Sequence, residues 1–113
     1  MGAKKIFTYE EAKVLIPTVR RITQTAFEQA DHVAQQLQTP NLEDDQRSEL
    51  EGEYETIVTG WAEQIFNLGC EIKGLWLVDF DNGKGYYCWK YPEQGLSFFH
   101  SYEEGFGGRM RIN

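Results

Sequence analysis

The stretch LWLVDFDNGKGYYCWKY, residues 75–91, decides the fold class, because its side chains follow the period of two that β-strands require. Asn82 and Gly83 lie between its two halves, and this dipeptide is the strongest short signal for a two-residue hairpin turn. A loop bounded by Pro and Gly follows, and residues 96–102 then predict a third strand. The sequence therefore predicts a three-stranded antiparallel meander over residues 75–102.

The positions of the turns predict which side chains share a face of this meander. The first turn places Asp79 opposite Tyr86, and a loop over residues 92–95 places Tyr87 opposite His100. One face is expected to be the core face, and it comprises Trp76, Val78, Phe80, Tyr87, Trp89, Leu96, Phe98 and His100. The other face mixes apolar and polar groups, and it comprises Leu75, Leu77, Asp79, Tyr86, Cys88, Lys90, Ser97 and Phe99.

Two long helices are predicted before the strands. Thr8 and Glu11 have the spacing of a capping box at the start of the first helix, residues 8–38, in which apolar side chains recur every three or four residues. Pro17 cannot donate a backbone hydrogen bond, so a kink is expected there rather than a break. The second helix is predicted over residues 42–68, and a glycine suited to a helix C-cap follows it.

The expected fold class is α+β, in a single domain over residues 1–113. A long antiparallel helical hairpin with a kinked first helix leads into the three-stranded meander, and a glycine-rich tail follows over residues 103–113. The second helix carries a coiled-coil-like seam of Leu50, Tyr54, Ile57, Trp61, Ile65 and Leu68. Because such helices are longer than the strands, the sheet cannot cover both helices along their length, and a homodimer through the helices is expected.

The composition narrows the range of partners. The net charge of −7 disfavours nucleic acids and anionic membranes, which attract proteins with local positive potential. No apolar run reaches the roughly 20 residues of a membrane helix, and no secretory leader is visible. Cys70 and Cys88 form no C-x-x-C motif, so free thiols in a reducing cytoplasm are expected. No cofactor is indicated.

The glycine-rich segment EGFGGR, residues 104–109, is the best candidate for a ligand site. Its glycine amides and the planar guanidinium of Arg109 can together bind an anion. The tail is expected to return across the sheet and to place Arg109 near Asp79, a carboxylate with poor strand propensity that needs a donor. The hypothetical ligand-binding set comprises Asp79, Tyr86, Lys90, His100 and Arg109.

Metal binding and thiol chemistry are two further hypotheses. His100 with Glu103, Glu104 or Asp79 offers the nitrogen and oxygen ligands that zinc, manganese or iron use, but the spacing matches no compact metal motif. Cys88 and His100 can act as nucleophile and base only if they share a face of the sheet. Since the expected register puts them on opposite faces, Cys88 is predicted to be a buried structural residue.

Five short motifs stand in order along the chain: FTYEEAKVLIPTVR (7–20), GCEIKGLWLVDF (69–80), CWKYPE (88–93), FFH (98–100) and EGFGGR (104–109). This ordered set resembles a bacterial family, domain of unknown function 2203, over nearly the whole chain. The resemblance implies a shared fold and shared residues, and it implies no reaction.

Two interpretations of function therefore stay open. The first is a small cytoplasmic binding or interaction module that acts as a homodimer, with an unidentified protein partner. The alternative is an enzyme, or a protein that binds a metal or a small anion, with its site on the second face of the sheet and in the glycine-rich tail.

Overall fold

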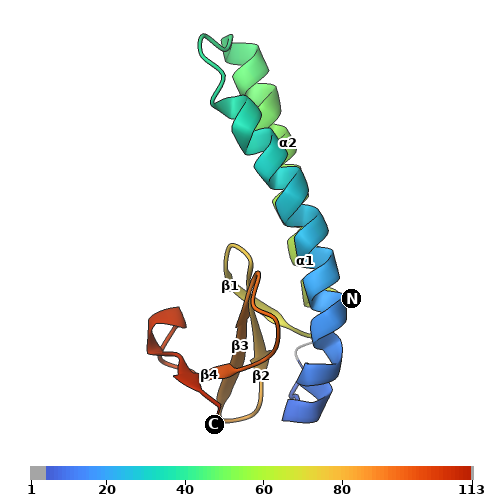
Figure 1. Ribbon diagram of the computed structural model, residues 1–113, viewed down its shortest axis with the longest axis vertical. Helices are drawn as coiled ribbons and strands as arrows, with labels where there is room; N and C mark the ends of the chain where they lie inside the picture. Colours follow the sequence, from blue (N-terminus) through green and yellow to red (C-terminus); the bar gives the residue numbers. More distant parts are fainter. Residues whose placement is uncertain (1–4, 113) are drawn as a thin grey trace.

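The computed structural model describes residues 5–112 and has a helical hairpin followed by an antiparallel sheet (Figure 1). The elements are α1 (Tyr9–Leu37), α2 (Asp44–Asn67), β1 (Glu71–Gly74), β2 (Leu77–Asp81), β3 (Gly85–Lys90), β4 (Phe98–Ser101), the 3₁₀ turn η1 (Phe106–Gly108) and β5 (Met110–Arg111). The five strands are neighbours in chain order. The predicted α+β class is confirmed, whereas the predicted count of three strands is wrong.

The helix start predicted at Thr8 is confirmed in atomic detail. The amide of Glu11 donates to Thr8 Oγ1 at 3.1 Å, and the amide of Thr8 donates to Glu11 Oε1 at 2.9 Å. These reciprocal bonds satisfy two backbone donors that a helix N-terminus otherwise leaves unpaired. α1 then continues through Pro17 without a break. Among the residues that the structure describes, no helix is both long enough and apolar enough to span a membrane.

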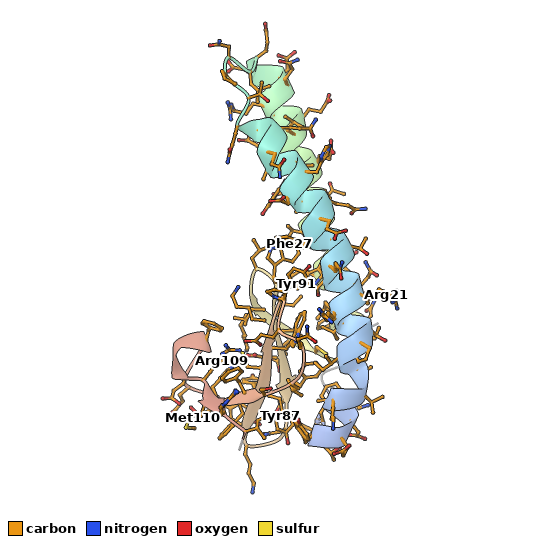
Figure 2. The ribbon with its side chains drawn as sticks, in the orientation of Figure 1. Arg21, Phe27, Tyr87, Tyr91, Arg109 and Met110 are labelled. Atoms are coloured by element: carbon orange, nitrogen blue, oxygen red, sulfur yellow. The ribbon has the colours of Figure 1, made fainter. Side chains whose placement is uncertain are left out.

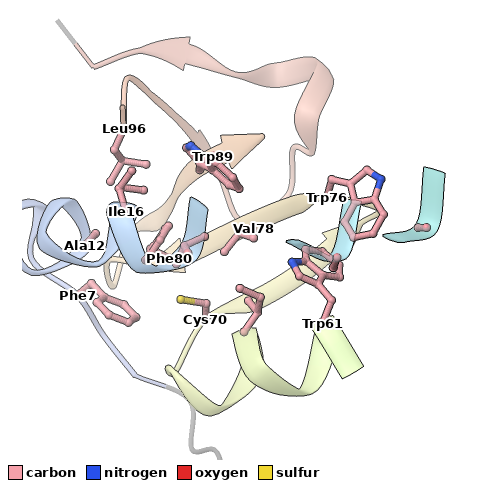
Figure 3. Packing of buried hydrophobic residues seen from close by; sticks show 14 residues of the cluster. Phe7, Ala12, Ile16, Trp61, Cys70, Trp76, Val78, Phe80, Trp89 and Leu96 are labelled. Carbon is pink, nitrogen blue, oxygen red and sulfur yellow. The ribbon is translucent and has the colours of Figure 1, made fainter. Parts of the chain in front are cut away.

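The core lies between the sheet and the adjoining half of the hairpin, and the other half projects beyond the sheet (Figure 1). Its largest fully buried side chains include Trp61, Trp89 and Phe80 (Figure 3). Along the predicted seam of α2, only Trp61 and Ile65 are buried, and the remaining apolar residues are half-buried. The apolar burial that stabilises the fold is therefore concentrated near the sheet.

Among the described residues, one side-chain hydrogen bond crosses the apolar interface of the two helices. Trp61 Nε1 donates to Thr23 Oγ1 at 2.8 Å, and both side chains are buried. Thr23→Val keeps the shape of the side chain but removes the acceptor, so the free energy of unfolding should fall by about 1–2 kcal/mol. Denaturant titration measures this change. Thr25→Val, at an exposed position of the same helix, is the control and should be near neutral; equal effects of the two changes would contradict the prediction.

The first strand and its turn were not predicted. Glu71–Gly74 pairs with β2, so residues 75–80 are not one strand, and Leu75 and Trp76 form the turn between β1 and β2. Trp76 has a φ of 62°, a left-handed conformation that a bulky residue rarely adopts. Its ring lies 4.9 Å from the ring of Trp61, centroid to centroid, in an edge-on arrangement. Aromatic packing in the core therefore accompanies this unusual backbone conformation.

The turn between β2 and β3 lies one residue later than predicted. The amide of Asn82 donates to the carbonyl of Gly85 at 2.9 Å, and Gly83 takes a φ of 90°. Glycine thus occupies the first central position, as in a type II′ turn, rather than the second. Asp79 consequently pairs with Cys88 instead of Tyr86. Each residue of β2 pairs with a residue two positions later in β3 than predicted, so the predicted faces of these two strands are unchanged.

Between β3 and β4, the predicted register is wrong and the faces do change. Tyr86 pairs with His100 and Cys88 pairs with Phe98, which is offset by one residue from the predicted register. Since side chains alternate along a strand, a one-residue offset exchanges the two faces of β4. The prediction that His100 and Phe98 lie on the core face is therefore wrong. His100 shares the face of Asp79 and Cys88.

Candidate metal centre

Three buried polar side chains meet on the face of the sheet that points away from the hairpin. Asp79 of β2 and Cys88 of β3 are 0% exposed, and His100 of β4 is 2% exposed. One potential ligand atom from each lies within 4.8 Å of those of the other two. Three consecutive strands each contribute one residue, so the register of the sheet holds the group together.

Hydrogen bonds at both ring nitrogens fix the orientation of His100. Nδ1 lies 2.8 Å from the carbonyl oxygen of Ser101, and Nε2 lies 2.9 Å from Oδ2 of Asp79. A carbonyl oxygen can only accept, so Nδ1 carries a proton. Nε2 and Oδ2 therefore share a further proton, and the buried pair is neutral as a whole. Histidine ligands of metals commonly show this same contact from the non-ligating nitrogen to a carbonyl.

The carboxylate of Asp79 is only partly satisfied. Its Oδ1 is buried and has no hydrogen-bond partner among the described residues. Burial raises the pKa of Asp79, and the charge of His100 and the nearby thiol of Cys88 oppose that rise. The thiol faces the carboxylate without hydrogen-bonding geometry to Oδ1. A buried oxygen without a donor is costly to the stability of a fold.

Cys88 is a protonated thiol in this arrangement. Burial raises the pKa of Cys88 to about 12, Asp79 adds to the rise, and Arg109 opposes it. His100 does share a face with Cys88, contrary to the predicted register, but both of its ring nitrogens already have partners. The geometry therefore provides no base for a nucleophilic thiol.

On the β1 side, Tyr86 connects the three residues to a small group of polar contacts. The ring of Tyr86 lies 5.4 Å from the ring of His100, centroid to centroid. Its hydroxyl donates to Glu71 Oε1 at 3.1 Å and accepts from Lys73 Nζ at 3.3 Å. Tyr86 was assigned to the candidate ligand set from the sequence, and the structure places it beside His100.

Arg109 approaches the group from the tail, on the far side of the sheet from α1 (Figure 2). Its predicted pairing with Asp79 is wrong, because Nη1 and Nη2 bind Glu93 at 3.1 and 2.8 Å. The guanidinium lies over two aromatic rings, 4.0 Å from the centroid of Phe98 and 4.3 Å from that of Phe106. The tail does return to the sheet, as predicted, where β5 pairs with β4.

The remaining predicted residues are not members of the buried group. Lys90 is half-buried at the end of β3, and its amide donates to Glu93 Oε1 at 2.9 Å. Glu103 and Glu104 are exposed, and Glu104 accepts from the hydroxyl of Ser101 at 3.2 Å. His100 therefore meets Asp79 and Cys88 rather than these glutamates.

Cys88 is the member of the group that the sequence did not identify as a possible ligand. The spacing of a Cys and a His on adjacent strands becomes informative only when the connecting loop is known. If that loop is one residue longer or shorter, the Cys and the His change from the same face of the sheet to opposite faces, or the reverse. One signal was available. Side chains alternate along a strand, and the predicted first turn already placed Cys88 and Asp79 on the same face of the sheet.

Comparison with known proteins identifies the family and gives no reaction. The family model described as "Uncharacterized conserved protein (DUF2203)" matches residues 5–112. No curated protein and no solved structure matches the chain. The profile covers both helices, the whole sheet and all three residues of the buried group. The chain belongs to the family of uncharacterized conserved proteins DUF2203.

Proposed function

We propose that this protein binds one divalent transition-metal ion of the zinc class through Asp79, Cys88 and His100. The observation that supports the proposal is the convergence of three different ligand types at one buried point, with Asp79 Oδ1 lacking a donor. Carboxylate oxygen, thiolate sulfur and imidazole nitrogen are the three ligand types that zinc uses in proteins.

The distances and charges suit such an ion. Zinc bonds of about 2.0–2.3 Å place tetrahedral ligands roughly 3.3–3.7 Å apart. The three donors lie within 4.8 Å, and the closest hydrogen-bonded pair is at 2.9 Å, so small side-chain movements suffice. Two anionic ligands, Asp79 and the Cys88 thiolate, balance the charge of one divalent ion. The buried site is then neutral with the metal as well as without it.

Three protein ligands leave one position of a tetrahedral site for water or another molecule. This ligand count is typical of zinc sites that act on bound molecules, whereas structural sites usually have four protein ligands. A reducing cytoplasm would keep Cys88 available as a ligand. The proposal thus develops the metal-binding interpretation of the sequence, with a ligand set in which Cys88 replaces the tail glutamates.

A metal-loading experiment tests the proposed site. The protein, stripped of metal with a chelator, should bind one equivalent of zinc or cobalt(II), and cobalt should give a thiolate-to-metal charge-transfer band. Asp79→Asn and Cys88→Ser should each weaken binding by at least about 100-fold, because each replaces an anionic ligand with a neutral one. Loss of stoichiometric binding in these variants, measured by equilibrium titration against a metal indicator, is the expected result.

Two matched controls use the other residues of the same types. Cys70→Ser changes the second thiol, which is buried in the hydrophobic core away from the group. His32→Ala changes the second histidine, which is exposed on α1. Both variants should bind the metal as the wild type does. A wild-type protein that binds neither zinc nor cobalt at micromolar concentration would rule out the proposal.

The second candidate function is a self-associating interaction module, and an apolar groove on the hairpin favours it. The groove is lined by Val58, Thr59, Ala62, Glu63, Phe66 and Ile72. Phe66 is 49% exposed, and no other element of the described residues covers the part of the hairpin beyond the sheet (Figure 1). A second copy of the chain that packed along α2 would bury both surfaces.

Light scattering coupled to size exclusion tests self-association. A dimeric mass at micromolar concentration is expected, and Phe66→Ser should shift it toward the monomer because it removes the largest apolar contact of the groove. Val14→Ser is the control, since Val14 is 73% exposed on α1 outside the groove. A monomeric mass for the wild type would show that the groove has no such role.

A further inference from the structure

We infer that two copies of this chain join edge to edge through β1, with the strand pairing antiparallel to its own copy about Ile72. The inference rests on the self-association proposed above and deepens it, because it names the strand, the register and the charges that join the copies. A two-fold axis at Ile72 presents the same surface on both sides of the interface, as homodimers commonly do.

β1 is the outermost strand on its side of the sheet. It comes first in the order of the five strands, and β2 is its one strand partner within residues 5–112. In an antiparallel pair, only alternate residues direct their N–H and C=O groups toward the neighbouring strand. An outermost strand of this kind is a template on which a further strand can add.

The charges of β1 make the strand complementary to itself. Glu71 and Lys73 flank Ile72, and both contact the hydroxyl of Tyr86, at 3.1 and 3.3 Å, so they share one face of the sheet. Antiparallel pairing about Ile72 sets Glu71 of each copy opposite Lys73 of the other. Facing opposite charges stabilise a strand pair, whereas facing like charges destabilise it. A lysine on an edge strand usually opposes pairing, but here it faces a carboxylate.

Both charged side chains are accessible to a second copy. Lys73 Nζ lies 3.1 Å from Glu71 Oε1 of its own strand, and the two side chains are 39% and 22% exposed. In the paired strands, these two ion pairs meet across the axis and form one network of four charges. Such a network contributes more than an isolated ion pair on the surface does.

Apolar surface continues from β1 onto the hairpin. Ile72 lines the groove that also includes Val58, Ala62 and Phe66 of α2, so its side chain lies on the hairpin side of the sheet. Pairing about Ile72 places both hairpins on the same side of the joined sheet and brings the two grooves together. A pair of four-residue strands alone is too small for a stable interface, and the grooves supply the apolar area that a dimer needs.

Charge exchange on the intact chain tests the inference by sedimentation equilibrium. Lys73→Glu sets glutamates against glutamates, and Glu71→Lys sets lysines against lysines, so each variant should dimerise at least about 10-fold more weakly than the wild type. An equimolar mixture of the two variants should regain dimers, because every facing pair then joins opposite charges. Lys84→Glu is the matched control, since it makes the same charge change at an exposed position of the turn between β2 and β3, and it should leave dimerisation unchanged.

Effects within one chain give a different pattern. If the variants act only through the ion pair inside each strand, mixing them cannot restore dimers, and the inference would be overturned. Circular dichroism establishes that each variant is folded. If Lys73→Glu does not fold, the neutral change Lys73→Gln takes its place and should weaken dimerisation about threefold; an unchanged dissociation constant would then decide against the inference.

The wild type separates this inference from the proposal on which it rests. A monomeric wild type contradicts self-association itself and leaves the edge of β1 to a strand of a different protein. A dimeric wild type whose folded single variants dimerise equally well contradicts the inference alone, because the copies then join through another surface.

Discussion

His100→Ala should lower the free energy of unfolding by about 3–5 kcal/mol in metal-free buffer. The change removes the sole hydrogen-bond partner of Asp79 Oδ2 among the described contacts, and Oδ1 has none. Asp79 is 0% exposed, so water cannot replace the imidazole without opening the sheet. Urea denaturation followed by circular dichroism measures the difference from the wild type.

Asp79→Asn is the matched control for this prediction. The amide keeps the shape of the carboxylate and can donate to His100 Nε2, while Nδ1 still donates to the carbonyl of Ser101. Both partners are then neutral and hydrogen-bonded, so the cost should stay below about 1.5 kcal/mol. The same variant removes an anionic ligand, and it should therefore remain folded while losing the metal. A cost for His100→Ala below that for Asp79→Asn would show that the pair contributes little to stability.

Gly85→Ala should lower the free energy of unfolding by about 3 kcal/mol, at the upper end of the range for overpacking. A Cβ at this position would overlap the carbonyl oxygen of His100 and lie 3.2 Å from Cα of Ser101. These are backbone atoms of the paired strand, so β4 would have to move away from β3. The displaced strand carries His100, and the variant should consequently lose metal affinity as well as stability.

Gly60→Ala makes the same chemical change where no atom lies in the way. Nothing lies within 4 Å of a Cβ built at Gly60, which is in the interior of α2. Alanine is the better helix former, so this variant should be more stable than the wild type by up to about 1 kcal/mol. Thermal unfolding of the two variants in parallel separates a steric effect from a general effect of removing glycine. A stable Gly85→Ala protein with wild-type metal binding would mean that the strands tolerate the extra methyl group.

The elements with strong local signals were predictable from the sequence. Thr8 and Glu11 identified the start of α1 because a capping box involves residues only three apart. Gly69, with a φ of 93°, follows the second helix as the C-cap pattern indicated. The alternation of Val78 and Phe80 with Asp79 separated the core face of β2 from its polar face. In each case the information lies within a few residues.

The placement of His100 was not predictable in the same way. Its face depends on the length of the connection after Lys90, and a loop that begins one residue earlier or later reverses the result. β1 was missed for a related reason: a strand of four residues, three of them half-buried and one exposed, carries little alternation of its own. Its pairing with β2 requires Trp76 in a left-handed conformation, which local propensity argues against.

The need of Asp79 for a donor was not enough to predict the partner of Arg109. Glu93 lies in the loop after β3, and its carboxylate is fixed by the amide of Lys90, a contact that depends on the detailed path of that loop. Asp79 and Glu93 were both possible partners of the Arg109 guanidinium, and nothing in the sequence indicates which of them binds it. Proximity in three dimensions decided in favour of Glu93.

The order of the strands has a consequence for how fast the site forms during folding. Each strand pairs with the one before it in the chain, so every closure within the sheet joins neighbouring segments. The loop entropy lost at each step is small, and chains dominated by such local pairings cross their folding barrier quickly. β2, β3 and β4 each supply one residue of the buried group. The group is therefore complete once β3 has paired with β2 and β4 has paired with β3, and no pairing between distant segments of the chain is needed.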